Sequence, residues 1–198
     1  MKHFLMSTVL TSLMLVSSLA GAETDPRAAD RAEMRAILAD VAKALNEGDY
    51  ALMKKHLHPQ VVITYYNAEV TRTPAEMEAY FRRMTDGDDA VVVGFHTTAN
   101  VSAPAIFHGD NTAIAWGTTR ENYKLASGLE FDLNGLWTVT LRRDNGQWKI
   151  VALHFSSNLF DNPILDNARS FTWITGAVAF ISGLIIAFVV MRVMRKKA

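Results

Sequence analysis

Five polar or aromatic side chains are the residues best suited to contact a ligand or a reacting group. The stretch GQWKIVALHFSSN (residues 146–158) places His154 near the end of a predicted strand, with Ser156 two residues later. Tyr65 in VVITYYN, His96 in VGFHTTAN and Trp116 in TAIAWGTT lie in other predicted strands. Since histidine titrates near pH ~6.5, histidine, tyrosine and serine around an apolar pocket could support ligand binding or general acid–base chemistry.

Structural roles are the alternative for the same residues. His154 could instead be a structural histidine bonded to a neighbour, and an aromatic side chain on a strand, such as Trp116, is commonly part of a core. Side chains alternate along a strand, so counting by two predicts which residues share a face with His154. One predicted face holds Trp148, Ile150, Ala152, His154 and Ser156, and the other holds Val151, Leu153 and Phe155.

The elements that would position these residues are helices first and strands later. Asp25-Pro26 predicts a helix start, and apolar residues then recur at spacings of three and four through Leu45. A short helix is predicted in DYALMKKHL and a strand in VVITYYN (61–67). Thr73-Pro74-Ala75-Glu76 reads as a capping box that opens a further helix. From residue 90 onward, four long strands separated by turn signals complete an α+β pattern.

The two ends of the chain predict export and a membrane anchor. Residues 1–22 have a basic start, an apolar core and an Ala-Gly-Ala cleavage pattern, which is typical of a signal peptide. Residues 171–191 are uncharged and long enough to cross a bilayer, and residues 192–198 form a basic tail. The sequence therefore predicts a domain at 23–158, a linker at 159–170 and a single transmembrane helix. Because basic residues stay on the cytoplasmic side, the domain is expected in the periplasm or outside, and the C-terminus in the cytoplasm, of an inner (cell) membrane protein.

Charge and composition exclude several classes of partner and cofactor. The predicted exported part has fifteen basic and twenty acidic residues, so its net charge of about −5 does not fit nucleic-acid binding. The chain has no cysteine, so its fold needs no disulfide. Metal-ligand clusters, phosphate-binding loops and nucleophile motifs are also absent from the sequence, which predicts neither a metal nor another cofactor.

Three segments carry a resemblance to a known family: LNEGDYALMKKHLHPQVVITYYN, TPAEMEAYFRRM and GLWTVTLRRDNGQWKIVALHFSSN. The chain resembles the nuclear transport factor 2-like superfamily, in its SnoaL-like and ketosteroid isomerase-like branch, over residues 27–158. The resemblance implies a cone-shaped, curved antiparallel sheet wrapped around the N-terminal helices, with a conical apolar pocket. It implies Tyr65, His96, Trp116, His154 and Ser156 as pocket candidates.

The resemblance leaves the activity open. Ketosteroid isomerases have a tyrosine on the first helix and paired pocket carboxylates, and the first helix here has no tyrosine on its apolar face, so that mechanism is not transferred. The leading hypothesis is a non-catalytic module that binds a small apolar molecule or supports assembly. The alternatives are an isomerase, cyclase or dehydratase acting on a small apolar substrate, and a structural dimer that recruits a protein partner.

A homodimer is a further expectation. The alternation along residues 147–157 predicts apolar side chains on both faces of the last strand, one of which would need cover. Small residues recur every four positions in the predicted membrane helix, at Thr175, Ala179, Gly183 and Ala187, and such a stripe favours close helix packing in lipid.

Overall fold

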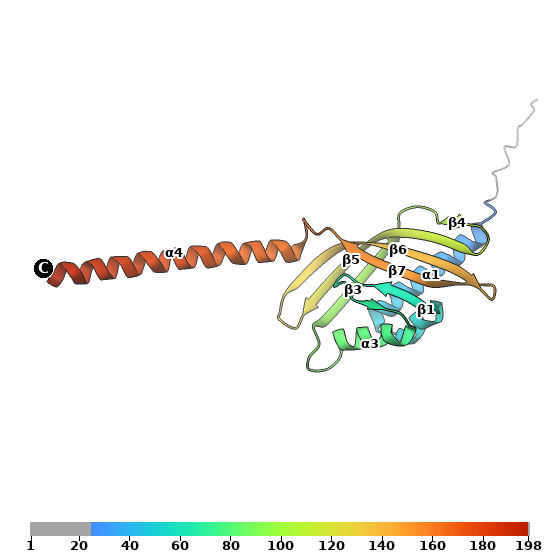
Figure 1. Cartoon of the computed structure of the whole chain (residues 1–198), viewed down its shortest axis with the longest axis horizontal. Helices are drawn as coiled ribbons and strands as arrows, with labels where there is room; N and C mark the ends of the chain where they lie inside the picture. Colours follow the sequence, from blue (N-terminus) through green and yellow to red (C-terminus); the bar gives the residue numbers. More distant parts are fainter. Residues whose placement is uncertain (1–24, 198) are drawn as a thin grey trace, which may run out of the picture.

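The computed structural model describes residues 25–197 as one curved sheet wrapped around helices, with a long helix leaving it (Figure 1). The helices are α1 (Ala28–Glu47), α2 (Tyr50–His56), α3 (Pro74–Thr85) and α4 (Pro163–Lys197). The strands are β1 (Leu57–Thr64), β2 (Val70–Thr71), β3 (Val92–Val101), β4 (Ile106–His108), β5 (Thr112–Leu125), β6 (Glu130–Asp144) and β7 (Gln147–Ser157). The predicted α+β class is confirmed, and the predicted signal peptide lies outside the described residues.

The strand order fixes which loops lie at which end of the domain. The strands follow the order β2-β1-β7-β6-β5-β3, and β4 pairs with β5. Only β1 and β7 pair in parallel, so the sheet within residues 25–197 is mixed rather than wholly antiparallel. It follows that β1, β5 and β7 end where β3 and β6 begin. We call this end, from which α4 leaves, the anchor end, and the opposite end the far end (Figure 1).

Helix α1 packs its apolar stripe into the concave side of the sheet. Met34, Ile37, Val41 and Ala44 are buried at the spacing that places residues on one face of a helix. Fully burying a side chain such as Ile37 contributes about 1.5–3 kcal/mol. The helix begins at Ala28, slightly later than predicted, with Arg27 and not Asp25 at the N-cap position. Asp25 instead accepts a hydrogen bond from the Arg27 backbone N–H at 2.9 Å.

The capping by Thr73 predicted for α3 is confirmed, but the reciprocal bond of the capping box is shifted by one residue. The Thr73 hydroxyl accepts a hydrogen bond from the Glu76 backbone N–H at 3.1 Å. The Glu76 carboxylate in turn accepts one from the Arg72 backbone N–H at 2.8 Å. The first bond satisfies a donor that the helix N-terminus would otherwise leave unpaired, whereas the second pairs the backbone of Arg72, the residue before the N-cap Thr73.

The alternation predicted for β7 is wrong from Val151 onward, because the strand contains a bulge. Leu141 pairs with Ile150 and Thr140 with Ala152, so Val151 is an extra residue that reverses which side chains point inward. Trp148 and Ile150 face the interior before the bulge, and Leu153 and Phe155 line it after the bulge. These apolar side chains therefore need no partner subunit to cover them.

Helix α4 is the one described helix long and apolar enough to cross a membrane. The qualifying segment runs from Pro163 to Arg192, with a mean hydropathy of 2.5 over its most apolar stretch and none of that stretch buried. The helix is continuous from Pro163, so the predicted linker already becomes helical before the apolar segment at 171–191. The fold thus presents one compact domain and one long apolar helix that is exposed along most of its described length (Figure 1).

Candidate functional site

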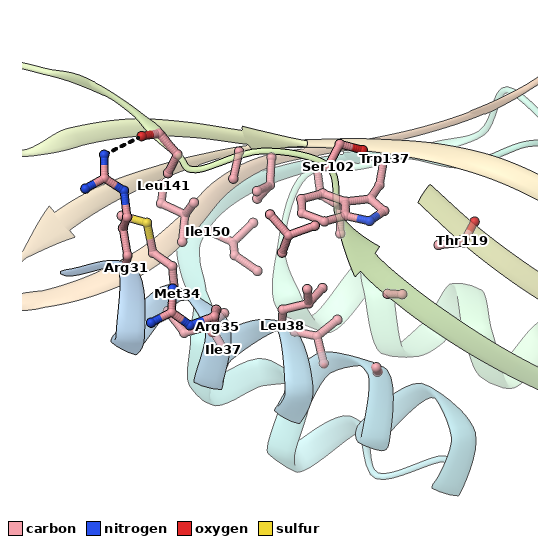
Figure 2. Close-up of a pocket in the computed structure, with 18 of the residues that line it drawn as sticks. Arg31, Met34, Arg35, Ile37, Leu38, Ser102, Thr119, Trp137, Leu141 and Ile150 are labelled. Atoms are coloured by element: carbon pink, nitrogen blue, oxygen red, sulfur yellow. Dashed lines mark hydrogen bonds between the residues drawn. The ribbon is translucent and has the colours of Figure 1, made fainter. Parts of the chain in front are cut away.

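A mainly apolar cavity of about 380 Å³ lies between α1 and the sheet, towards the far end (Figure 2). Arg31 and Arg35 of α1 lie at one end of it and Trp137 of β6 at the other. The Arg31 guanidinium binds Asp25 at 2.6 Å and donates to the Ala105 backbone carbonyl at 3.3 Å. The walls are apolar side chains, among them Leu38, Val41, Ala115, Val139, Ile150 and Leu153. This far cavity can enclose a small apolar group.

A second cavity of about 420 Å³ lies towards the anchor end and is more polar. Its walls come from the beginning of β3, the end of β5, α3 and the residues that follow β1. Leu45 and Phe155 line both cavities, so the two spaces adjoin along the inside of the cone. The aromatic wall of this anchor-side cavity consists of Tyr50, Tyr65, Tyr66, Tyr80, Phe81, Phe95, Tyr123 and Phe155.

Glu121 is the buried carboxyl group of the anchor-side cavity. It is only 3% exposed. Tyr123 donates a hydrogen bond to its Oε2 atom at 2.6 Å, and the Tyr66 hydroxyl lies 3.4 Å from its Oε1 atom. The Tyr66 hydroxyl also bonds the Thr119 hydroxyl at 2.9 Å. We call Tyr66, Thr119, Glu121 and Tyr123 the Glu121 cluster.

The Glu121 cluster contains no cation, and this sets its electrostatics. Burial raises the pKa of Glu121, and the hydrogen bonds that it accepts, led by that from Tyr123, oppose this effect without overcoming it. Among the described residues no lysine or arginine pairs with Glu121. Burial, and then the charge of Glu121, also raise the pKa values of Tyr66 and Tyr123. The cluster therefore favours protonated groups, which can both donate and accept hydrogen bonds.

A glycine makes room for the Glu121 cluster. A Cβ atom added at Gly135 of β6 would lie 1.8 Å from the Tyr66 hydroxyl oxygen and 2.5 Å from the Thr119 hydroxyl oxygen. Any side chain at this position would thus displace the hydroxyl pair. The absence of a Cβ in the middle of a strand lets another chain segment approach closely. Gly135 is therefore part of how the fold builds this site.

Of the five predicted pocket residues, the structure places Tyr65 beside a cavity. Tyr65 is 6% exposed, stacks on Tyr80 with 3.8 Å between ring centroids, and bonds the Thr71 hydroxyl at 3.0 Å. His154 and Ser156 follow the bulge in β7 and lie on the convex side of the sheet, where His154 is exposed. His154 neighbours Thr64 of β1 and Thr138 of β6.

The other two predicted residues also lie outside the residues that line the two cavities. His96 of β3 is exposed and pairs with Asn122 of β5. Trp116 of β5 is half-buried and pairs with Thr138, in the row of residues that includes His154. The structure therefore does not bring the two histidines, Trp116 and Ser156 together with Tyr65.

Glu121 and Tyr66 were not predicted, although β5 contains a signal for the first of them. Counting by two from Ala113 through Ala115, Gly117 and Thr119 reaches Glu121, and all of these residues are buried. The same count places Glu121 on the buried face of the strand and its neighbour Arg120 on the exposed face. The pairing of Glu121 with Tyr66 has no local signal, because the two residues are 55 positions apart.

Comparison with known structures supports the fold. The chain is similar to a hexachlorocyclohexane dehydrochlorinase from Novosphingobium barchaimii, with a TM-score of 0.59 and 15% identity, over 69% of this chain and 91% of that one. It is similar to a ketosteroid isomerase-like protein from Erwinia carotovora, with a TM-score of 0.56 and 16% identity, over 65% and 95% of the two chains. A conserved protein from Planctomyces limnophilus has a TM-score of 0.55 and 16% identity, over 66% and 97%.

Sequence comparison identifies the family. A search of curated proteins finds no match to the chain. The family profile described as the SnoaL-like domain matches residues 26–154, which include α1 to α3 and nearly all of the sheet. The curved sheet around helices and the two cavities, lined by Trp137 and by Glu121, are consistent with this family. The chain therefore belongs to the SnoaL-like domain family of the nuclear transport factor 2-like superfamily.

Proposed function

We propose that this protein is a membrane-anchored binding domain for a small, neutral, mostly apolar molecule with a carbonyl or hydroxyl oxygen. The observation that supports this most directly is Glu121, a buried carboxyl group without a cation partner, at the wall of a cavity that is otherwise largely aromatic. A ligand oxygen would hydrogen-bond within the Glu121 cluster. The apolar part of the ligand would lie against the aromatic wall and, beyond Leu45 and Phe155, in the far cavity.

The chemistry of the cavity favours a neutral ligand. An anion placed next to Glu121 would be repelled by the ionised form of this residue and would find no cation in the cluster. A neutral ketone or alcohol can instead accept a hydrogen bond from the protonated carboxyl group or from a tyrosine hydroxyl. Ketone binding should then be strongest at low pH and weaken as pH rises through the raised pKa of Glu121.

A matched pair of probes tests this proposal. Calorimetric titration of the full chain in detergent micelles would compare 2-acetylnaphthalene with 2-ethylnaphthalene, which has nearly the same shape but no oxygen. We expect the ketone to bind about tenfold more tightly, since one hydrogen bond contributes about 1–1.5 kcal/mol. Glu121→Gln should keep this preference and lose its pH dependence, because the neutral amide can still donate.

Glu121→Leu is the variant that decides the test. Leucine is close to glutamate in size but cannot donate or accept a hydrogen bond. If the Glu121 carboxyl group is the donor, the affinities of this variant for the two probes should become nearly equal. A tenfold preference that survives in Glu121→Leu would mean that the Glu121 carboxyl group is not the donor to the ligand oxygen. Equal binding of both probes to the unchanged protein would overturn the proposal itself.

A second candidate function is acid–base catalysis at the same cluster, and Glu121 again favours it. Raised carboxyl pKa values are typical of groups that donate or remove protons in enzymes. The structural neighbours include a dehydrochlorinase and a ketosteroid isomerase-like protein, although at 15–16% identity they support only a shared fold. A protonated Glu121 could transfer its proton to a ligand carbonyl oxygen while a water molecule takes a proton from the adjacent carbon, which would form the enol.

Hydrogen exchange in the probe separates catalysis from binding. If the cluster acts as an acid–base site, the methyl protons of 2-acetylnaphthalene should exchange in D₂O at least about tenfold faster with the protein than in buffer. Glu121→Gln should abolish this acceleration while retaining the bound ketone, since an amide can donate a hydrogen bond but cannot transfer its proton to the ketone oxygen. Exchange at the buffer rate in the unchanged protein would leave binding as the function.

A further inference from the structure

The anchor-side cavity lies at the end of the domain that faces the membrane helix. The cavity is lined by Val92, Val93 and Phe95 from the beginning of β3, and by Glu121 and Tyr123 from the end of β5. β7 ends at the same edge of the sheet and continues into α4 after five residues. Figure 1 shows the β5–β6 hairpin and the loop between α3 and β3 at the end from which α4 leaves.

The distances along the chain bring this end close to a bilayer. Helix α4 has eight residues (163–170) before the apolar segment, which at 1.5 Å per residue separate its start from the hydrocarbon core by about 12 Å. The β5–β6 hairpin extends past the end of β7, whose last residue, Ser157, pairs with Gly135 of β6. The five residues from Glu130 to Asn134 add about 17 Å of strand towards this end. The hairpin can therefore reach the headgroup region, which occupies the outer 5–8 Å or so of each leaflet.

The side chains at this end suit a membrane surface. Phe95, Tyr123 and Phe131 form an aromatic row across β3, β5 and β6, with ring centroids 5.0 and 5.4 Å apart. Tyr123 is at once part of this row and a hydrogen-bond donor to Glu121. Val91 and Val93 are 49% and 58% exposed beside the row. Aromatic side chains are enriched where proteins meet the bilayer interface, because their rings are apolar and their edges polar.

The same end continues as exposed apolar chain into α4. Leu159 and Phe160, which join β7 to α4, are 74% and 81% exposed, and Ile164 in the first turn of α4 is 54% exposed. Helix α4 also contacts β6. This exposed apolar surface is continuous with the apolar helix. If the helix crosses a membrane, the surface next to it contacts lipid as well.

We infer that the anchor end of the domain lies on the bilayer surface and that the anchor-side cavity takes its ligand directly from the membrane. The ligand class is then a neutral, lipid-soluble alcohol or ketone. The exposed acidic residues Asp88 and Asp89, in the loop beside the cavity, disfavour an anionic lipid or a fatty-acid anion at the entrance, whereas Asp86 is paired with Arg82 at 3.2 Å. This inference rests on the proposed binding function and on the proposed anchoring by α4.

Single cysteines can locate the bilayer, because the chain has none of its own. The full chain with Val93→Cys, labelled with a nitrobenzoxadiazole fluorophore, would be reconstituted in phosphatidylcholine vesicles. A bromine-labelled phosphatidylcholine should then quench its emission by at least about half. Gln147→Cys is the matched control: it is also exposed and on a strand, but lies at the far end, so its emission should change by less than about a tenth. Equal quenching at both positions, or none at Val93, would overturn the membrane contact.

A displacement experiment on the unlabelled, unchanged full chain in the same vesicles tests the ligand class. Farnesol, a neutral fifteen-carbon alcohol, should displace bound 2-acetylnaphthalene from the protein, whereas farnesoic acid at pH 8 should not. Displacement by both, or by neither, would contradict the inferred class. If 2-acetylnaphthalene itself fails to bind in micelles, the binding function has failed, whereas quenching at Val93 still reports the membrane contact independently.

Discussion

Replacing Gly117 by alanine should cost at least about 3 kcal/mol of the free energy of unfolding. A Cβ atom at this position would lie 1.8 Å from the Asn100 backbone oxygen and 2.6–2.7 Å from the Trp137 indole ring. The first contact is with the backbone of the neighbouring strand β3, and the second is with the wall of the far cavity. Neither can move without opening the sheet or displacing Trp137, so the cost lies at the upper end of what added methyl groups usually cause in a packed interior.

Gly94→Ala provides the matched control for Gly117→Ala. Gly94 also lies in this sheet, but its nearest contact would be the Lys124 Cβ at 3.2 Å, which a small shift can relieve. Urea unfolding of the full chain in micelles, followed by tryptophan fluorescence, should show a much smaller loss for Gly94→Ala. Equal losses for the two variants would mean that the close approach at Gly117 does not control stability.

Replacing Asp30 by alanine should cost about 3 kcal/mol at pH 7. The Asp30 carboxylate is 8% exposed and accepts hydrogen bonds from Arg27 at 3.2 Å, from the Trp148 indole at 3.2 Å, and from Arg143. It thus ties the start of α1 to β6 and β7. Removing it would leave an indole N–H and two guanidinium groups without their shared acceptor, and removing one partner of a buried ion pair typically costs about 3–5 kcal/mol. The lower value is expected because Arg143 and Arg27 are partly exposed.

The cost of Asp30→Ala should depend on pH in one direction. Burial raises the pKa of Asp30, but the hydrogen bonds from Trp148 and Arg27 and the charge of Arg143 outweigh it, so the pKa lies below 3.8 in the folded protein. A carboxyl group with a lowered pKa stabilises the fold at pH values above its unfolded pKa and loses that contribution as pH falls through its folded pKa. The difference in unfolding free energy between the two proteins should therefore be constant near neutral pH and shrink below about pH 4. A difference that grows on acidification would contradict this account.

How much of this could be read from the sequence depends on the range over which each signal acts. The spacing of Met34, Ile37 and Val41 and the capping box at Thr73 are local patterns, and both elements form as predicted. The bulge at Val151 is a single inserted residue that the register with β6 determines, and no local pattern marks it. His154 was assigned to the pocket side because the alternation was continued across this bulge.

The binding site is less predictable than the fold because its residues come from distant segments. Glu121 looks like an ordinary charged residue in TTRENYKL until the inward face of β5 is counted from Ala113. Tyr66 lies just beyond β1 and reaches Glu121 only because Gly135 leaves space for its hydroxyl group. Three elements must pack before these groups meet, so neither composition nor spacing could reveal the cluster.

The most direct test of the central claim is a pH titration of the Glu121 carboxyl group by infrared difference spectroscopy, with Glu121→Gln to identify its band. Since the raised pKa of Glu121 comes from burial in the cavity, we expect a titration midpoint above that of an exposed glutamate, ~4.3. If a ligand oxygen accepts a hydrogen bond from the protonated group, saturating 2-acetylnaphthalene should raise this midpoint further. 2-Ethylnaphthalene cannot accept such a bond, so it should raise the midpoint less. A midpoint in the ordinary range that neither probe changes would contradict the account.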